Sequence, residues 1–114
     1  MAQNKKEKFS KIENDVADFA RMLSHPARIA ILKKLADKNK CICGEIVEVM
    51  PLAQSTVSQH LKELQLSGIV QGTIDGLTSC YCINWKVLEK EMDNFNKLFE
   101  DLKQKRINFN KTCC

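Results

Sequence analysis

Apolar residues recur at helical spacing along most of the chain. The first predicted helix carries a stripe whose members lie three or four residues apart: Phe9, Ile12, Val16, Phe19 and Leu23. Such spacing places them on one face of an α-helix. Ser24-His25 interrupts the pattern, and Pro26 is well suited to the first position of a second helix capped by Ser24 or His25. This second helix ends within residues 37–40. Its apolar positions are Ala27, Ile31, Leu32 and Leu35.

Two shorter helices follow. The third is predicted over roughly residues 44–50, and Pro51-Leu52-Ala53 forms a tight connection to the fourth. The fourth begins at about Ser55, and Gly68 ends it at the position after the C-cap. Its inward positions are spaced at i, i+4 and i+7: Val57, Leu61 and Leu64. Two short helices joined by three or four residues predict a helix-turn-helix.

A β-hairpin and a long helix complete the pattern. The β-prone runs 69–74 and 77–83 flank Asp75-Gly76, a dipeptide typical of hairpin turns. The last helix carries apolar residues at alternating four- and three-residue spacing: Leu88, Met92, Phe95, Phe99 and Leu102. We therefore expect a mainly α chain with a β-hairpin, the winged helix-turn-helix fold. Residues 1–108 would form the DNA-binding and dimerisation domain, and residues 109–114 a tail that ends in cysteines.

The first and last helices have narrow apolar stripes, as helices in coiled-coil-like seams do. These stripes could cover the core of their own domain, or they could pair with the same helices of a second copy. Five short elements leave such long stripes underfilled. We therefore expect a homodimer formed through the first and last helices.

Composition narrows the class of protein. The 114 residues suffice for one domain, with 18 Lys+Arg against 14 Asp+Glu and a net charge of +4. No apolar run approaches the roughly 20 residues of a membrane span, and the Lys-rich start has no apolar segment behind it. We expect a soluble, cytoplasmic protein with no membrane partner. No Cys-x-x-Cys, paired carboxylates or phosphate loop are present, so we do not expect an enzyme.

The outer face of the fourth helix carries short polar side chains near the helix N-terminus. Such side chains contact base edges when a recognition helix enters the major groove, and glutamine pairs with adenine. The alternative is an ordinary solvated helix face. We predict contacts with double-stranded operator DNA through Gln54, Ser55, Thr56, Ser58, Gln59, His60 and Lys62.

Positive charge avoids this segment. Residues 51–84 contain Lys62 against Glu63 and Asp75, a net charge of −1. Because Lys and Arg contacts to phosphates normally supply much of the affinity for DNA, other cations have to contribute. We expect them from the terminal helices and from Lys33, Lys34, Lys38 and Lys40, and we expect a shallow dependence of DNA binding on salt.

The chain resembles a known family in two stretches, Arg21 to Leu32 and Ser55 to Leu64, with further similarity at 67–70 and 76–84, including Tyr81. The resemblance is to the arsenic-repressor (ArsR/SmtB) family of winged-helix regulators and covers residues 18–84. It implies a homodimeric repressor that leaves its operator when a thiophilic ion or an oxidant arrives. The usual basic wing is absent here.

Six cysteines occur as three close pairs: Cys41-x-Cys43, Cys80-x-Cys82 and Cys113-Cys114. In a reducing compartment such pairs indicate metal binding or redox sensing. The family resemblance makes Cys41-x-Cys43 an inducer site, although the third local cysteine of many members is missing. We expect this pair at the entrance of the third helix. In a regular α-helix, the side chains of residues i and i+2 point about 200° apart. An ion would then require an irregular helix start, which Gly44 favours.

The missing donors could come from the end of the chain. We therefore predict a metal site of Cys41, Cys43, Cys113 and Cys114. No permanently bound cofactor is expected. As(III) or Sb(III) is the expected inducer ahead of Cd(II), Pb(II) or Zn(II).

Other arrangements stay open. Cys80 and Cys82 suit plain strand packing, or a zinc centre together with Cys41 and Cys43. The alternative functions are a thiol redox-sensing repressor and a zinc-stabilised winged-helix interaction module. No histidine follows His60, which excludes the zinc site that other family members build from Asp and His on the last helix. His25 is expected to cap a helix, and His60 to pack or to face DNA.

Overall fold

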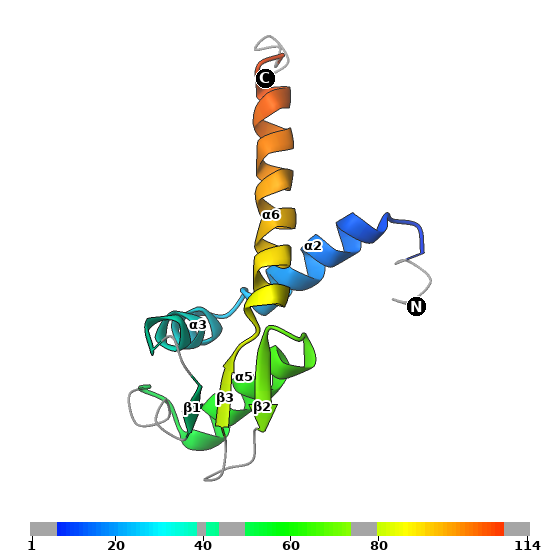
Figure 1. Cartoon of the computed structure of the whole chain (residues 1–114). Helices are drawn as coiled ribbons and strands as arrows, with labels where there is room; N and C mark the ends of the chain where they lie inside the picture. The colour runs from blue at the N-terminus through cyan, green and yellow to red at the C-terminus, as the bar shows by residue number, and fades with distance from the viewer. Residues whose placement is uncertain (1–6, 39–40, 44–49, 74–79, 109–114) are drawn as a thin grey trace.

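The computed structural model describes residues 7–38, 41–43, 50–73 and 80–108, with the side chain of Cys43 outside this description. Its elements in chain order are α2 (Lys11–Met22), α3 (Pro26–Lys38), β1 (Ile42–Cys43), α5 (Gln54–Leu66), β2 (Val70–Thr73), β3 (Cys80–Ile83) and α6 (Trp85–Arg106) (Figure 1). The order of helices and hairpin strands agrees with the predicted winged-helix fold. The predicted third helix, apart from Met50, and the predicted hairpin turn lie outside the described residues.

Local chemistry sets the helix ends. Ser10 caps α2 in a reciprocal capping box with Glu13, so that each side chain accepts a backbone N–H of the other residue. At the start of α3, His25 Nδ1 accepts a hydrogen bond from the Ala27 backbone N–H at 3.0 Å, which confirms the predicted cap. Gly68 has a φ of +87° just beyond the end of α5, a conformation that glycine adopts without strain.

The described strands form one antiparallel sheet in the order β1-β3-β2. Strand β1 corrects the sequence analysis, which placed Cys41-x-Cys43 at a helix entrance. The backbone is extended there because Ile42 lies opposite Tyr81 and both side chains are buried in the core. On the other side of β3, Gly72 in β2 has a φ of +123°, and a Cβ at that position would lie 2.1 Å from the Cys80 carbonyl oxygen. Only glycine allows β2 to approach β3 this closely.

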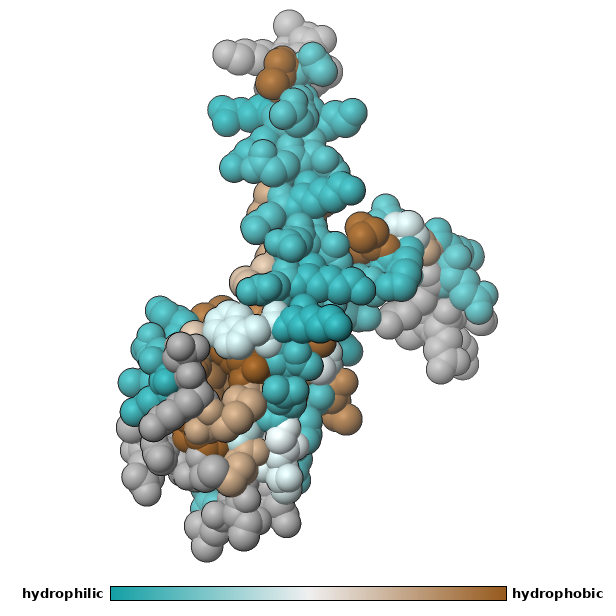
Figure 2. Space-filling model, viewed as in Figure 1, coloured by the Kyte–Doolittle hydropathy of each residue, from teal (hydrophilic) through white to brown (hydrophobic). Residues whose placement is uncertain are grey.

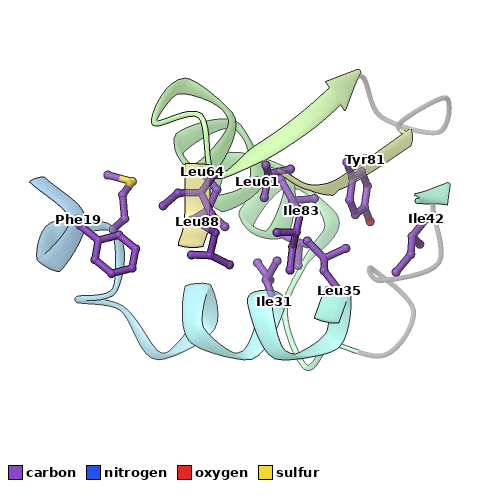
Figure 3. Close-up of a cluster of buried hydrophobic side chains, with 13 residues drawn as sticks. Phe19, Ile31, Leu35, Ile42, Leu61, Leu64, Tyr81, Ile83 and Leu88 are labelled. Carbon is purple, nitrogen blue, oxygen red and sulfur yellow. The ribbon is translucent and has the colours of Figure 1, made fainter. Parts of the chain in front are cut away.

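The hydrophobic core lies between α3, α5 and the sheet, and α2 and α6 contribute at one side (Figure 3). Figure 3 shows Leu61 and Leu64 from α5 directed toward Ile31 and Leu35 from α3, with Tyr81 and Ile42 at the sheet end. Ile31, Leu61 and Leu64 are 0%, 1% and 0% exposed. The predicted apolar face of the fourth helix is therefore confirmed as the centre of the core.

The last helix extends well beyond this core (Figure 1). The radius of gyration is 17.4 Å, whereas a compact domain of this length has about 13 Å. At its base α6 packs against α2 through an edge-to-face contact between Phe19 and Phe95, with ring centroids 5.4 Å apart. Farther along, apolar side chains of α6 are exposed: Met92, Leu98, Phe99 and Leu102.

The exposed apolar residues of α6 do not cover the helix on all sides. Figure 2 shows the viewed side of α6 as almost entirely hydrophilic up to its C-terminal end. Helix α2 adds an exposed apolar residue, Ile12, and Phe9 is exposed just before it. Within the described residues, no helix is long and apolar enough to cross a membrane.

Candidate nucleic-acid interface and thiol cluster

Helix α5 has one buried and one exposed face. Val57, Leu61 and Leu64 are almost fully buried, whereas Gln59 and Lys62 between them are exposed. Among the predicted DNA-contacting residues, Ser58 is half-buried. Five others are exposed: Gln54, Ser55, Thr56, Gln59 and Lys62. Their hydroxyl, amide and ammonium groups are therefore available to base edges and phosphates.

The N-terminus of α5 adds backbone donors to this face. Ala53 occupies the N-cap position and offers no side-chain hydrogen bond, and the first turn carries no acidic residue. The first N–H groups of a helix have no partner within the helix and carry partial positive charge. An uncapped end without acidic residues is therefore a favourable place for a DNA phosphate.

His60 does not share this outward direction. Its residue surface is 9% exposed, and its Nδ1 accepts a hydrogen bond from Arg28 Nε at 3.3 Å. The His25 ring lies against it, with centroids 4.3 Å apart. Burial, followed by the nearby His25 and Arg28, lowers the pKa of His60. The residue therefore connects α5 to the start of α3, and we leave it out of the proposed DNA contacts.

Cations reach the same region from α3. Lys33 and Lys34 are exposed and line a shallow pocket together with Met50, Pro51 and Leu52, residues of the connection that leads into α5. Two cations of α3 therefore lie beside the connection that precedes α5. Lys38 is also exposed on α3, whereas Lys40 lies outside the described residues.

The cysteines of β1 and β3 come together. Cys41 and Cys82 form a disulfide, with Cα atoms 4.3 Å apart and 41 residues of sequence separation. Cys80 also takes part in a disulfide, and the residue opposite it in the strand register is Cys43. The structure thus unites two of the three cysteine pairs. Cys113 and Cys114, predicted to ligate with Cys41 and Cys43, lie outside the described residues.

Exposure changes the interpretation of the wing cysteines. Strand packing is the expected role of Cys80 and Cys82. Cys80 is exposed, however, and Cys82 is half-buried, whereas Tyr81 between them is 1% exposed. Strand packing is therefore carried by Tyr81. Gln71 of β2 lies on the same side, with its Nε2 3.7 Å from Cys82 Sγ.

The expected metal site does not contain the contact between Cys41 and Cys82, which only the alternative zinc centre of both cysteine pairs implies. A signal was present, because both cysteine pairs repeat with the two-residue period of a β-strand around an apolar residue. Two such segments can pair with all cysteines on one face. Because 41 residues separate Cys41 from Cys82, the sequence offers no reason to prefer this arrangement to a site with the tail cysteines.

The chain resembles known proteins in sequence and in fold. Residues 25–71 match the description "Bacterial regulatory protein, arsR family". The chain is 38% identical over 64 residues to the HTH-type transcriptional repressor SmtB of Mycobacterium tuberculosis, covering 56% of this chain and 47% of that one. With the transcriptional repressor PagR of Bacillus anthracis it shares 30% identity over 76 residues, covering 67% and 75% of the two chains.

The fold comparison agrees. An ArsR-like transcriptional regulator from Rhodococcus sp. RHA1 superposes with a TM-score of 0.64 at 18% identity, covering 84% of this chain and 90% of that chain. The chain belongs to the arsR family of bacterial regulatory proteins. It matches about half the length of the SmtB relative. The relatives bear the names of transcriptional regulators, in agreement with the prediction that this chain is not an enzyme.

Proposed function

We propose that this protein is a DNA-binding transcriptional repressor that leaves its operator when a thiophilic metalloid or metal binds its cysteines. The observation that carries the proposal is the division of α5 into a buried apolar face and an exposed polar face. Family membership supports the same function. The proposed place of action is the cytoplasm.

DNA recognition is assigned to the exposed face of α5. Gln59 is suited to bidentate pairing with adenine, and the hydroxyl groups of Ser55 and Thr56 can serve several bases. Phosphate contacts come from the uncapped start of α5, from Lys62 and from the lysines of α3. With so few cations at the interface, the logarithm of the operator affinity should change with the logarithm of salt by a slope shallower than about −8. A steeper slope would mean that the interface contains many more phosphate contacts.

The proposed repressor is a homodimer formed by α2 and α6. An exposed apolar stripe on a helix that projects from its own domain is typical of an interaction surface. Two copies related by a twofold axis would cover this stripe reciprocally and place two α5 helices for two half-sites. Phe99→Asp should therefore produce monomers in sedimentation analysis. Glu100→Gln, also an exposed substitution on α6, should leave the dimer intact.

The sensing step is assigned to cysteine thiolates, with Cys41 and Cys43 immediately before the first part of the helix-turn-helix. Cys113 and Cys114 remain proposed donors. As(III) and Sb(III) are the preferred inducers because soft trivalent ions bind thiolates, and Cd(II), Pb(II) and Zn(II) rank below them.

The inducer test uses protein reduced with a dithiol and DNA from the protein's own promoter. Operator affinity is followed by fluorescence anisotropy while As(III), Sb(III), Cd(II) or Zn(II) is added. Wild type should release DNA with at least one of these ions, and Cys41→Ser should lose the response. An unchanged response of Cys41→Ser would contradict the proposed sensing step.

A second candidate function is a redox-sensing repressor, favoured by the disulfide between Cys41 and Cys82. In that case two thiols lose two electrons and two protons to a peroxide, which becomes two molecules of water. Intact mass and operator affinity before and after mild peroxide, without added metal, test this function. Loss of two hydrogens per disulfide together with DNA release would support it, and disulfide formation without DNA release would exclude it.

A further inference from the structure

The cysteine pairs Cys41-x-Cys43 and Cys80-x-Cys82 lie opposite each other in the register of β1 and β3. In the antiparallel register, Ile42 lies opposite Tyr81 and Cys43 lies opposite Cys80, so Cys41 falls opposite Cys82, to which it is bonded. Side chains alternate between the two faces of a strand. Ile42 and Tyr81 point into the core, and Cys41, Cys80 and Cys82 lie on the opposite, outer face. The backbone of Cys43 pairs with that of Cys80, which makes Cys43 the fourth cysteine of this strand pair.

We propose that Cys41, Cys43, Cys80 and Cys82 form one tetrathiolate site for a soft divalent ion on this outer face. The inference rests on the proposed function and deepens it by replacing the tail cysteines with those of the wing. We name these four positions the wing thiol site. It differs from the expected site in that β3 supplies half of its donors.

The placement of the cysteines is unusual for packing and suitable for ligation. Cysteine is among the residues most often buried in proteins, yet Cys41 and Cys80 are exposed on the outer face. Four thiolates are the donor set that Zn(II) and the softer Cd(II) take in tetrahedral geometry, with metal–sulfur distances of about 2.3 Å for zinc. A solvent-facing site also lets an ion enter without opening the core.

The distances require only a local adjustment. Across the strands, Cys41 and Cys82 are already bonded to each other. Along each strand, residues two apart stand roughly 6.5–7 Å apart at Cα, so the thiolates have to lean toward the centre of the square. Among the described side chains, no three potential ligands surround one point. In the proposed site, the thiolates come together only when the ion binds.

Ion binding requires reduced cysteines. Each disulfide accepts two electrons and two protons from a dithiol and yields two thiols. A divalent ion then displaces four protons and binds four thiolates, which leaves the complex with a charge of −2. Gln71 Nε2, 3.7 Å from Cys82 Sγ, is placed to donate a hydrogen bond to a thiolate and to stabilise its charge.

The wing thiol site is connected to both ends of α5. Strand β1 precedes α5 in the chain, and β3 pairs with β2, which follows α5. Gln65 of α5 also donates a hydrogen bond to the Gly72 carbonyl of β2. An ion that draws β1 and β3 together would therefore act on the sheet that supports α5, and the added negative charge would disfavour nearby phosphates.

The test measures ion binding separately from DNA release. Protein reduced by a dithiol and freed from it is titrated with Cd(II), and thiolate-to-metal absorption and native mass give the number of thiolates per ion. The probe variants are Cys80→Ser and Cys82→Ser. The control is Thr73→Ser, which lies opposite Cys80 on β2. The double variant Cys113→Ser/Cys114→Ser distinguishes the wing thiol site from a site that uses the tail cysteines.

If the wing thiol site holds the ion, wild type, Thr73→Ser and the tail double variant should each bind one Cd(II) per chain through four thiolates. Cys82→Ser should bind Cd(II) at least about 100-fold more weakly than wild type. Loss of a hydrogen-bond partner of a metal ligand already lowers metal affinity about 10–100-fold, and this variant loses a ligand itself. Unchanged Cd(II) binding by Cys80→Ser and Cys82→Ser would overturn the wing thiol site. Lost binding in the tail double variant would overturn it as well.

Operator release by the same samples separates the two proposals. If wild type binds Cd(II) through four thiolates but no ion releases DNA, the proposed function fails and the wing thiol site stands. If ions release DNA from Cys80→Ser and Cys82→Ser as they do from wild type, the proposed function stands and the wing thiol site fails.

Discussion

The two faces of the β1–β3 pair differ in what they do, although their residues alternate along the same strands. On the inner face, Ile42 and Tyr81 are 3% and 1% exposed and belong to the core. On the outer face, Cys41 and Cys80 are exposed and Cys41 is bonded to Cys82. The inner face holds the wing to α3 and α5, and the outer face carries the cysteines of the proposed wing thiol site. Neighbouring residues can therefore be changed with separate effects on stability and on ligand binding.

Helix α5 shows the same division. Leu61 and Leu64 fill the core, whereas Gln59 and Lys62 between and beside them reach solvent. His60 belongs with the inner face. In both elements, the outer face lies outside the hydrophobic core, and on the sheet its contribution to stability comes from the disulfide. The following predictions test how sharply the two faces are separated.

The largest effect is expected from the inner face of the sheet. Tyr81→Ala should lower the free energy of unfolding by about 3–5 kcal/mol, because it removes a large, fully buried ring. Chemical denaturation of the reduced protein measures the loss. The matched change on the outer face, Cys80→Ser, should cost less than about 0.5 kcal/mol under the same conditions. Equal losses would show that both faces stabilise the fold.

Reduction should have the next largest effect. The disulfide between Cys41 and Cys82 closes a long loop, and a cross-link of this kind stabilises a fold by about 2–4 kcal/mol. Treatment with a dithiol should therefore lower the free energy of unfolding of wild type by that amount. The double variant Cys41→Ser/Cys80→Ser lacks one cysteine of each opposed pair, Cys41 with Cys82 and Cys43 with Cys80. Its free energy of unfolding should therefore not change on treatment with a dithiol. A response of this variant would place the stabilising disulfide elsewhere.

On the outer face of α5, Gln59→Ala should weaken operator binding by about 1–3 kcal/mol and reduce discrimination between operator and unrelated DNA. Its free energy of unfolding should change by less than about 0.5 kcal/mol, because the side chain is exposed. Anisotropy titrations on both DNAs measure the effect. Uniform weakening on both DNAs would mean that Gln59 contacts phosphate instead of a base.

The smallest effect concerns pH. Burial, His25 and Arg28 lower the pKa of His60 in the fold, so the unfolded chain takes up its proton first as the pH falls. The stabilisation from neutral His60 is present above its ordinary pKa of about 6.5 and is lost as the pH falls toward the lower folded value. Denaturation between pH 7.5 and pH 5, compared with His60→Asn, measures it. The same pH dependence in both proteins would contradict the assignment.

Patterns within one element could be predicted from the sequence. The period of Val57, Leu61 and Leu64 and the stop at Gly68 predicted α5 correctly, because both signals lie inside or next to the helix. The cap at His25 is local in the same sense. The exposed face of α5 followed directly from the buried one.

Contacts between distant segments could not be derived from local patterns alone. Strand β1 has two residues, too few to show alternation, and its partner follows about 40 residues later. The partner of His60 is Arg28, which lies 32 residues away, so the helical pattern left its direction open. The disulfide between Cys41 and Cys82 depends on the same long-range pairing. For that reason, the proposed partners of Cys41 and Cys43 differ between the expected site, which uses Cys113 and Cys114, and the wing thiol site.

The most direct test of the outer-face chemistry is the operator affinity of reduced protein with and without one equivalent of Cd(II) per chain. Wild type should lose affinity by about 5–150-fold, the usual range for coupling between two sites. The double variant Cys80→Ser/Cys82→Ser should keep its affinity in the presence of the ion. Unchanged wild-type affinity, or equal release from the double variant, would contradict the account.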